Sequence, residues 1–411
     1  MPALFAITLF VSAFLLFLVQ PMMGRMILPK LGGTPAVWNA CMVFFQAVLL
    51  AGYGYAHAST TWLGSRRQAM LHCLVLLLPL MVLPVLISDD SFRGAGSSDN
   101  PIGLVLLLLA TSIGLPFFVV STTGPLLQRW FADTGHPSAK DPYFLYAASN
   151  VGSLLALIAY PLLVEPQLVL VSQSNFWAWC YVGYAVLVVC CGLALSRTSI
   201  SLETVAVRQS SDESPLTGTR RLKWIFLAFV PSSLLLGATT YVSTDIAPIP
   251  LLWIVPLTLY LLSFILVFSQ KQIIPHTVST RLLPICILLL TLMLVTGATE
   301  LKGLPLWLLL LLHLATFFLT SMVGHGEMAL DRPAARHLTE FYLWMSVGGV
   351  LGGLFNALLS PIVFQRTGLT EYPVAIVLAC FLTLPTALAR QSKGSPNKSQ
   401  FLTADIAWPV G

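Results

Sequence analysis

Neutral polar side chains within strongly apolar sequence are the residues of this chain best suited to hold a small solute. The candidates are Gln20, Asn39, Gln46, Asn150, His313 and Asn356. An amide offers both donors and acceptors, so a few such groups in an apolar pocket fix the orientation of a polar ligand. Asn39 and Gln46 lie seven residues apart, close to two helical turns, and therefore share one helix face.

Gln20 precedes Pro21, which lacks a backbone donor and leaves a helical carbonyl free near that turn. The same polar side chains would also serve as hydrogen-bonding links between helices, an interaction worth ~0.6 kcal/mol on average in membranes. Both roles, lining a cavity and joining helices, stay open from the sequence.

Ionisable side chains are nearly excluded from the apolar blocks. Proton coupling across a membrane commonly uses a carboxylate or histidine near the midplane, and His313 is the candidate for that role. The alternative is a neutral histidine bonded to a neighbouring helix. Because no carboxylate is expected at depth, an organic-cation pocket is less obvious.

Charged and histidine side chains gather in residues 324–340, between two apolar blocks. We expect a solvated loop there, with a cytoplasmic gate or a docking surface as alternatives. The gate candidates on this side are Arg66, Arg67, His325, Glu327, Arg332 and Glu340. A metal site using His325, Glu327 and His337 matches no zinc spacing, so we predict no metal and no other cofactor.

The composition is that of an integral membrane protein. Hydrophobic residues make up 57% and charged residues 9%, with a mean hydropathy of +0.85, whereas soluble domains carry about 25% charged residues. The net charge of +5 needs no nucleic-acid partner, because cytoplasmic loops of membrane proteins collect Lys and Arg. The seven cysteines lie in apolar blocks without metal-type spacing, so we interpret them as packing residues.

Twelve apolar stretches approach the roughly 20 residues that cross a bilayer as a helix. They cover residues 4–24, 36–56, 69–87, 102–125, 143–164, 176–195, 223–243, 249–268, 282–298, 304–324, 341–363 and 372–389. The N-terminus lacks a basic segment and a clear cleavage site, so the first stretch is expected to be an uncleaved span.

The distribution of positive charge predicts the orientation. With both termini in the cytoplasm, 16 of the 21 Lys and Arg residues fall on the cytoplasmic side. This asymmetry is the usual signature of membrane topology. We therefore expect a multi-pass protein of a bacterial-type inner membrane, with the lipid bilayer as its surroundings.

A polar tract rich in Ser, Thr and charged residues divides the chain into similar halves. It predicts an N-terminal half at 1–196, a cytoplasmic linker at 197–223, and a C-terminal half with a short tail at 224–411. Pro35 and Trp38 of the first half recur, with the same spacing, as Pro250 and Trp253 of the second.

The second copy also repeats Phe117-Phe118 as Phe317-Phe318, and Pro161 as Pro361. Because six is an even number, both copies enter the membrane in the same direction. The predicted fold is all-α and polytopic, with two parallel six-helix repeats arranged as in major facilitator proteins.

The repeat also predicts an outer gate. The alignment that matches Trp38 with Trp253 also matches Lys30 with Asp245, and both follow the first helix of their half. Opposite charges would then face each other across the outer mouth, with Arg25 as an alternative partner for Asp245. Two exposed loop charges worth ~0–1 kcal/mol are the other interpretation.

Several motifs resemble the membrane region of the fused major-facilitator/spermidine-synthase proteins. They are Gln20-Pro21, residues 28–38, Phe44-Phe45-Gln46, and residues 141–150, 250–253 and 337–344. The similarity covers essentially the whole chain. In that family a soluble domain similar to spermidine synthase often follows, but no Gly-rich nucleotide loop follows a plausible strand here. We therefore expect the catalytic part to be absent or supplied by another polypeptide, and no catalytic residue in this chain.

The leading hypothesis is a major-facilitator-like transporter of a small solute that works by alternating access, with a polyamine-related solute implied only by the resemblance. The alternative is a non-transporting module that anchors, or supplies substrate to, a spermidine-synthase-like aminopropyl- or methyltransferase. Residues 63–67 resemble the basic tail of the major-facilitator loop signature, but lack its aspartate. The sequence names neither the solute nor a coupling ion.

Overall fold

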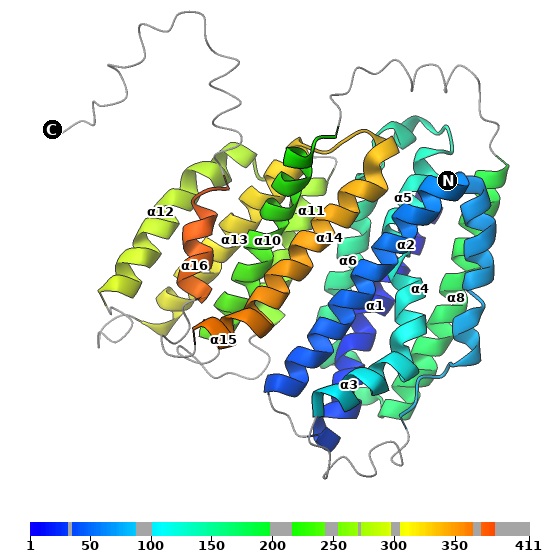
Figure 1. Cartoon of the computed structure of the whole chain (residues 1–411), viewed down its shortest axis with the longest axis horizontal. Coiled ribbons are helices and arrows are strands. Elements are labelled where there is room, and N and C mark those ends of the chain that lie inside the picture. The colour runs from blue at the N-terminus through cyan, green and yellow to red at the C-terminus, as the bar shows by residue number, and fades with distance from the viewer. Residues whose placement is uncertain are drawn as a thin grey trace, which may run out of the picture.

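The computed structural model of the chain describes residues 1–31, 35–87, 101–197, 216–242, 254–269, 273–296, 305–364 and 371–382. Every regular element within these ranges is a helix (Figure 1). The absence of strands in the described part follows from the sequence, because a helix satisfies its own backbone hydrogen bonds inside a bilayer. Strongly apolar blocks therefore fold as helices here.

The elements run in two series. Up to residue 196 they are α1 (Pro2–Leu31), α2 (Pro35–Val75), η1 (Leu78–Met81), α3 (Pro101–Leu109), η4 (Ala110–Gly114), α4 (Leu115–Ser121), α5 (Thr123–Ala132), η5 (Pro137–Lys140), α6 (Phe144–Ala159), η6 (Tyr160–Val164), α7 (Glu165–Gln167) and α8 (Leu170–Ser196). From residue 218 they are α10 (Gly218–Tyr241), α11 (Ile254–Phe268), α12 (His276–Val295), α13 (Leu306–Leu330), η8 (Ala335–His337), α14 (Leu338–Leu354), η9 (Phe355–Leu359), α15 (Ser360–Val363) and α16 (Glu371–Ala379).

The chain is a multi-pass membrane protein. Its described part holds nine helical stretches that are long and apolar enough to cross a membrane. One of them, Ala40–Met81, contains most of the second and the third expected spans. The eighth expected span appears as the 15-residue helix α11, and the last as α16 with nine described residues. The count of twelve spans stays a prediction.

The chain reverses direction inside α2, at Gly64. This residue has φ 69° and ψ 163°, a conformation that side chains with a Cβ avoid. Beyond the turn, the Gln68 amide donates to the Ala56 carbonyl at 3.2 Å and to the Ser59 hydroxyl at 2.7 Å. The two arms of α2 therefore lie antiparallel, which explains why two expected spans belong to one element.

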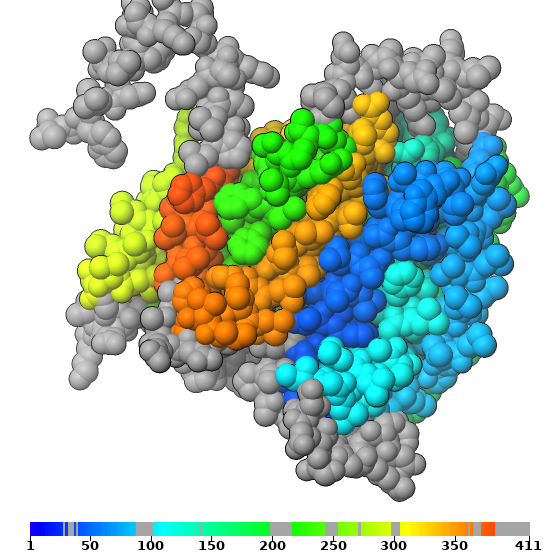
Figure 2. Space-filling view, in the orientation of Figure 1, coloured from blue at the N-terminus to red at the C-terminus, as the bar shows by residue number. Residues whose placement is uncertain are grey.

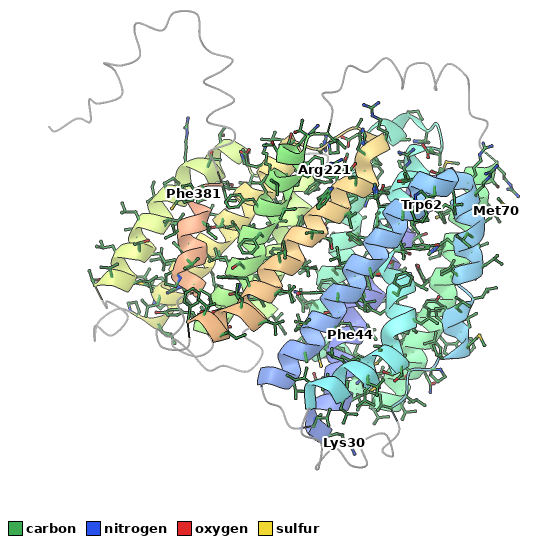
Figure 3. The ribbon with its side chains drawn as sticks, viewed as in Figure 1. Lys30, Phe44, Trp62, Met70, Arg221 and Phe381 are labelled. Atoms are coloured by element: carbon green, nitrogen blue, oxygen red, sulfur yellow. The ribbon has the colours of Figure 1, made fainter. Side chains whose placement is uncertain are left out.

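Two ends of the molecule are easily distinguished. The end that carries the N-terminus, the end of α8 and the start of α10 is called the linker end, and the opposite one the far end (Figure 1). Arg221 and Trp62 lie at the linker end, whereas Lys30 lies at the far end (Figure 3). Helix α10 begins at Gly218, inside the stretch assigned to the linker, and the Thr217 side chain caps it by accepting from the Arg220 backbone N–H at 3.3 Å.

The buried apolar residues form two cores that follow the predicted halves. One core uses residues between Phe5 and Leu195, and the other uses residues between Trp224 and Leu382 together with Tyr143. Tyr143 comes from the start of α6, so the first half contributes one ring to the second core. The division at 1–196, 197–223 and 224–411 remains a proposal that agrees with this separation.

Matching close contacts support the repeat. A Cβ on Gly152 of α6 would overlap the Phe10 carbonyl of α1, and a Cβ on Gly348 of α14 would overlap the Ile225 carbonyl of α10. Phe10 and Ile225 correspond in the same alignment that matches Trp38 with Trp253. The two π-helical turns η6 and η9 follow these contacts in the same order. Equivalent helices thus pack in the same way in each half.

The prediction of a solvated loop over residues 324–340 is wrong for its first part. Helix α13 continues to Leu330, and His325 and Glu327 are buried within it. Both find polar partners: His325 Nδ1 lies 2.8 Å from the Ser263 hydroxyl, and Glu327 Oε1 lies 2.9 Å from His276 Nε2. Because Ser263 and His276 pair with His325 Nδ1 and Glu327 Oε1, these polar side chains can be buried and the helix extends past the apolar sequence.

Candidate functional site

A cavity of about 610 Å³ lies between the two halves, nearer the far end than the linker end. Helices α1, α2 and the α6–η6–α7 run form its first-half wall, and α10 and α11 form the other. The lining residues lie in the far-end parts of these helices; in α1, for example, they lie between Phe17 and Pro29. Its volume lies in the range of about 300–1,000 Å³ that is usual for small-molecule sites.

The lining is mainly apolar, with a few polar groups. The apolar members include Phe17, Pro21, Gly24, Pro29, Met42, Leu157, Leu235, Leu236 and Leu257. The polar members are Gln20, Arg25, Tyr160, Glu165 and Thr239. An apolar wall with a small number of placed polar groups is typical of ligand sites.

Arg25 and Glu165 form an ion pair within this lining. Their Nη1 and Oε1 atoms are 3.0 Å apart, and the two side chains are 47% and 36% exposed. Both residues belong to the first half, on α1 and α7. Asp245 lies outside the described residues, so neither its proposed pair with Lys30 nor its alternative pair with Arg25 is described. The structure shows Glu165 as the partner of Arg25, which the sequence reasoning missed.

Tyr160 and Gln173 support the ion pair from behind. The Arg25 guanidinium lies within hydrogen-bonding reach of the Tyr160 hydroxyl. That hydroxyl donates to Gln173 Oε1 at 3.2 Å, and the Gln173 amide donates to the Leu168 carbonyl at 2.8 Å. Gln173 is buried, so these two hydrogen bonds fix the position of the Tyr160 hydroxyl beside Arg25.

Gln20 is the predicted cavity residue that the structure places in this lining. Its amide donates to the Leu16 carbonyl at 3.2 Å. Pro21 cannot donate to the carbonyl of Phe17, four residues earlier, and both residues line the cavity. A backbone acceptor without its usual helical donor is therefore present in the wall, as the sequence predicts.

Of the other predicted cavity residues, Asn356, His313 and Gln46 contact neighbouring helices, whereas Asn150 bonds within its own helix. Asn356 donates to the Ser233 hydroxyl at 2.8 Å, and Asn150 donates to the Tyr146 carbonyl at 2.8 Å. His313 is buried in the second half, where its Nδ1 is bonded to the Tyr372 hydroxyl. Gln46 of α2 packs against Gly353 of α14. The side chain of Asn39 lies outside the described residues.

Hydrogen bonds and rings join the halves at the linker end. Tyr342 of α14 donates to Gln128 Oε1 of α5 at 2.6 Å. Tyr143 donates to the Pro333 carbonyl at 2.8 Å, and the rings of Tyr146 and Tyr342 lie 5.1 Å apart. Figure 2 shows α14 (orange) packed along α2 (blue) across the middle of one face. The passage between the halves is closed at this end.

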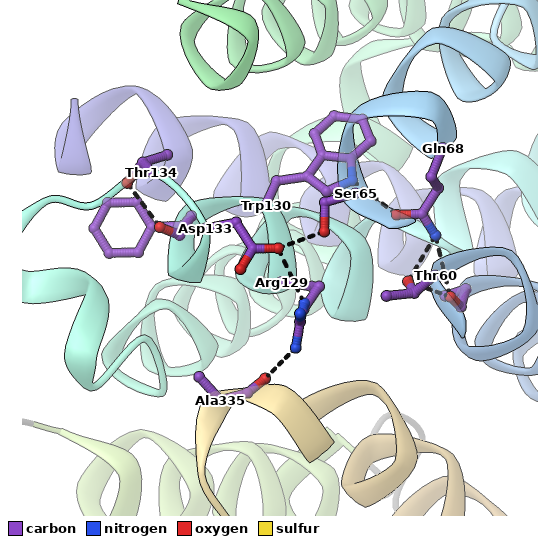
Figure 4. A network of polar contacts seen from close by, with 10 residues as sticks. Thr60, Ser65, Gln68, Arg129, Trp130, Asp133, Thr134 and Ala335 are labelled. Atoms are coloured by element: carbon purple, nitrogen blue, oxygen red, sulfur yellow. Dashed lines mark hydrogen bonds and ion pairs between the residues drawn. The ribbon is translucent and has the colours of Figure 1, made fainter. Parts of the chain in front are cut away.

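Charged side chains add to the closure. Arg332 Nη2 lies 2.7 Å from Asp141 Oδ2 of the other half, and Arg129 Nη1 donates to the Ala335 carbonyl at 3.0 Å (Figure 4). Asp133, which directly follows α5, also accepts from Arg129 at 3.2 Å and from the Ser65 hydroxyl. Asp133 thus supplies a carboxylate beside the 63–67 turn, which lacks its own.

The remaining gate candidates differ in position. Glu340 accepts from Arg221 at 2.7 Å within the second half, and the Asp331 carboxylate receives Arg220 and Lys223 at 3.2 and 3.3 Å. Arg66 and Arg67 are exposed at the linker end. Among the ion pairs described for the gate candidates, that of Arg332 with Asp141 joins the two halves. Within the described residues, no cluster of three metal-ligating side chains occurs.

Comparison with known proteins identifies the fold but no named family. No family model matches the sequence, and no curated protein matches it. Solved structures match over nearly the whole chain. The proton:xylose symporter XylE, of the major facilitator superfamily, aligns with a TM-score of 0.59 and 13% identity over 94% of this chain and 95% of that one.

Two further transporters give similar values. A bacterial homologue of the iron transporter ferroportin, in an outward-facing state, aligns with a TM-score of 0.60 and 13% identity over 94% and 99% of the two chains. The human organic anion transporter MFSD10 aligns with a TM-score of 0.56 and 15% identity over 94% and 97%. The chain therefore has the fold of the major facilitator transporters.

Proposed function

We propose that this protein transports a small solute by alternating access, with its two halves rocking about the central cavity. The observation that carries the proposal is one cavity walled by the far-end parts of both halves, together with contacts that join the halves at the linker end. Such a site becomes accessible from the other side when these contacts break and the far ends approach.

The charge distribution indicates which end of the molecule is cytoplasmic, and therefore on which side of the membrane the cavity lies. The linker end carries the excess of Lys and Arg that marks a cytoplasmic face. With this orientation, the cavity faces outward and the cytoplasmic side is closed. The termini then lie in the cytoplasm of a bacterial-type cell. Both assignments belong to the proposal.

The cavity does not favour a polycation. Its described lining contains one carboxylate, Glu165, and Arg25 already neutralises it at 3.0 Å. A polyamine would bring several positive charges into an apolar wall without counter-charges, which is costly. We therefore propose a neutral or zwitterionic solute, and retain the kinship with the fused major-facilitator/spermidine-synthase proteins as a proposal about ancestry.

The alternative of a non-transporting membrane module makes a different prediction. A module that anchors a transferase needs no change in which side reaches the cavity. Cysteine accessibility therefore separates the two functions. Leu236 of α10 lines the cavity, whereas Leu227 of the same helix is fully buried in the second core.

The experiment places a single cysteine at either position in a background without the seven native cysteines. Membrane-impermeant thiol reagents are applied from each side of sealed vesicles. For a transporter, Leu236→Cys reacts from the far-end side, and weakening the closure exposes it to the linker side as well. Leu227→Cys stays protected from both sides. Labelling of Leu236→Cys from one side only, in every variant that weakens the closure, contradicts alternating access.

A further inference from the structure

The charges of the cavity define the class of solute that it binds, an inference that rests on the proposed function. Arg25 and Glu165 are the charged side chains of the described lining, and they sum to zero. A solute with net charge would leave one charge uncompensated beside apolar walls, at a high desolvation cost. A solute with no net charge leaves the site balanced.

The ion pair also has unused binding capacity. A guanidinium has five N–H donors, and a carboxylate has two oxygens. Arg25 directs Nη1 to Glu165 Oε1, and the Tyr160 hydroxyl is within its hydrogen-bonding reach. Both charged groups are partly exposed, at 47% and 36%. Each therefore still has hydrogen-bonding positions that a solute can reach.

A zwitterion matches this pair better than an uncharged molecule does. Its carboxylate can bind Arg25 while its ammonium binds Glu165, which produces an alternating square of four charges. Each charge then has two neighbours of opposite sign, and the Arg25–Glu165 contact need not break. Charge-assisted hydrogen bonds of this kind are about twice as strong as neutral ones.

The surrounding wall supplies the remaining contacts. Pro21 leaves the Phe17 carbonyl without its usual helical donor, and both residues line the cavity. Met42, Leu235 and Leu236 provide an apolar surface for the body of the solute. The combination is a charged pair next to an apolar chamber of about 610 Å³.

We propose that the cavity binds an amino-acid-like zwitterion with an apolar side chain, with its carboxylate on Arg25 and its ammonium on Glu165. Tyr160 and Gln173 act as positioning residues for Arg25. The charged pair then selects solutes by their charge, and the apolar wall selects them by their side chain.

The test uses four compounds with the same ring but different charges. They are phenylalanine, phenethylamine, 3-phenylpropanoate and 2-phenylethanol, each added to the purified full-length protein in lipid nanodiscs at millimolar concentration. A bound ligand raises the unfolding temperature, because it stabilises the state that binds it. We expect phenylalanine to raise it, and the amine, the acid and the alcohol to raise it much less, because the amine and the acid bring a net charge and the alcohol pairs with neither charged group.

Variants of the charged pair localise the effect. Arg25→Gln and Glu165→Gln each remove one charge-assisted contact, so we expect a roughly tenfold to hundredfold loss in affinity for phenylalanine. Arg197→Gln removes a charge from an exposed position at the linker end and should leave the affinity unchanged. The double swap of Arg25→Glu with Glu165→Arg keeps both charges and should recover part of the loss.

The outcomes separate this proposal from the proposed function. Equal stabilisation by the amine, the acid or the alcohol overturns the zwitterion assignment, and so does the lack of any shift with phenylalanine. Neither result changes the cysteine labelling, which tests alternating access independently. Conversely, one-sided labelling together with selective stabilisation by phenylalanine would leave a binding site without transport.

Discussion

The two ends of this molecule join their helices in opposite ways. At the linker end, polar contacts cross between the halves, as in the pairs Tyr342–Gln128 and Arg332–Asp141. At the far end, the ion pair Arg25–Glu165 stays within the first half and lines a cavity. The first arrangement holds the halves together, whereas the second, under the proposed function, prepares a surface for a solute.

This difference explains where a conformational barrier would lie. Contacts between the halves at the linker end must break before the cavity can open there. Contacts within one half move with that half as a rigid body and add nothing to the barrier. Changes at the linker end should therefore alter the balance between states, while equivalent changes at the far end should alter solute binding.

The largest expected effect comes from Tyr342→Ala. The ring of Tyr342 is fully buried, packs against Tyr146 of the other half and donates to Gln128. Removing a buried aromatic side chain costs ~3–5 kcal/mol. Because Tyr146 and Gln128 lie across the interface, a substantial part of this loss falls on the closed state.

We expect Tyr342→Ala to expose Leu236→Cys to thiol reagents from the linker side. The matched control Tyr342→Phe keeps the ring contacts and loses the hydroxyl, for a cost of ~1–3 kcal/mol from the unpaired Gln128. Labelling rates should therefore increase from wild type to Tyr342→Phe and then to Tyr342→Ala. If both variants label from the linker side as slowly as wild type, Tyr342 does not hold the halves together.

A smaller effect is expected from Gly64→Ala, which tests the turn at the linker end. The backbone of Gly64 occupies a region that is nearly restricted to glycine, and no atom lies within 4 Å of an added Cβ. The cost is therefore backbone strain alone, ~1–3 kcal/mol. Ser65, the next residue, donates to Asp133, so strain at the turn should also disturb this contact.

The matched control for Gly64→Ala is Gly54→Ala. Gly54 lies in the first arm of the same element, and an added Cβ there also has no neighbour within 4 Å. In a regular helix, alanine is favoured over glycine by up to ~1 kcal/mol. Thermal unfolding of the purified variants should show a lower midpoint for Gly64→Ala and an unchanged or higher one for Gly54→Ala. Equal midpoints would contradict the strained turn.

Much of the fold could be predicted from the sequence, because the bilayer requires helices wherever apolar runs are long. The repeat was also visible, since Pro35 and Trp38 recur in the second half with the same spacing. The reversal at Gly64 was predicted as a loop, although the helical hydrogen bonding continues almost to the turn. The extension of α13 to Leu330 was missed, because His325 and Glu327 obtain partners from α11 and α12 that are distant in sequence.

The candidate site was harder to predict than the fold. Gln20 and Pro21 lie in the lining of the cavity, and the role of Gln20 in binding a solute stays a prediction. Glu165 was missed because it follows Pro161 at the end of an apolar run, where a charge is usually solvated. Its partner Arg25 lies far earlier in the chain, and only the packing of α1 against α6 brings the two together.

The smallest expected effect concerns the two exposed ion pairs, and it gives the sharpest comparison of the two ends. Arg332 and Asp141 are 39% and 55% exposed, and Arg25 and Glu165 are 47% and 36% exposed. Solvent screens both pairs, so each is worth ~0–1 kcal/mol. Their geometry differs, because one pair joins the halves and the other does not.

Double-mutant cycles distinguish the two pairs, using Arg332→Gln with Asp141→Asn and Arg25→Gln with Glu165→Gln. The readout is the rate at which Leu236→Cys is labelled from the linker side, which reports the population that opens there. For Arg332–Asp141, each single change should raise the rate by up to about fivefold, since ~1 kcal/mol shifts a two-state population by that factor. The double change should add little more, because the contact is already lost. For Arg25–Glu165, the rate should remain at the wild-type value in all three variants, since the pair moves with one half. A linker-side rate that responds equally to both cycles would show that the two ends are coupled through the first half, and that the division of roles between them is incorrect.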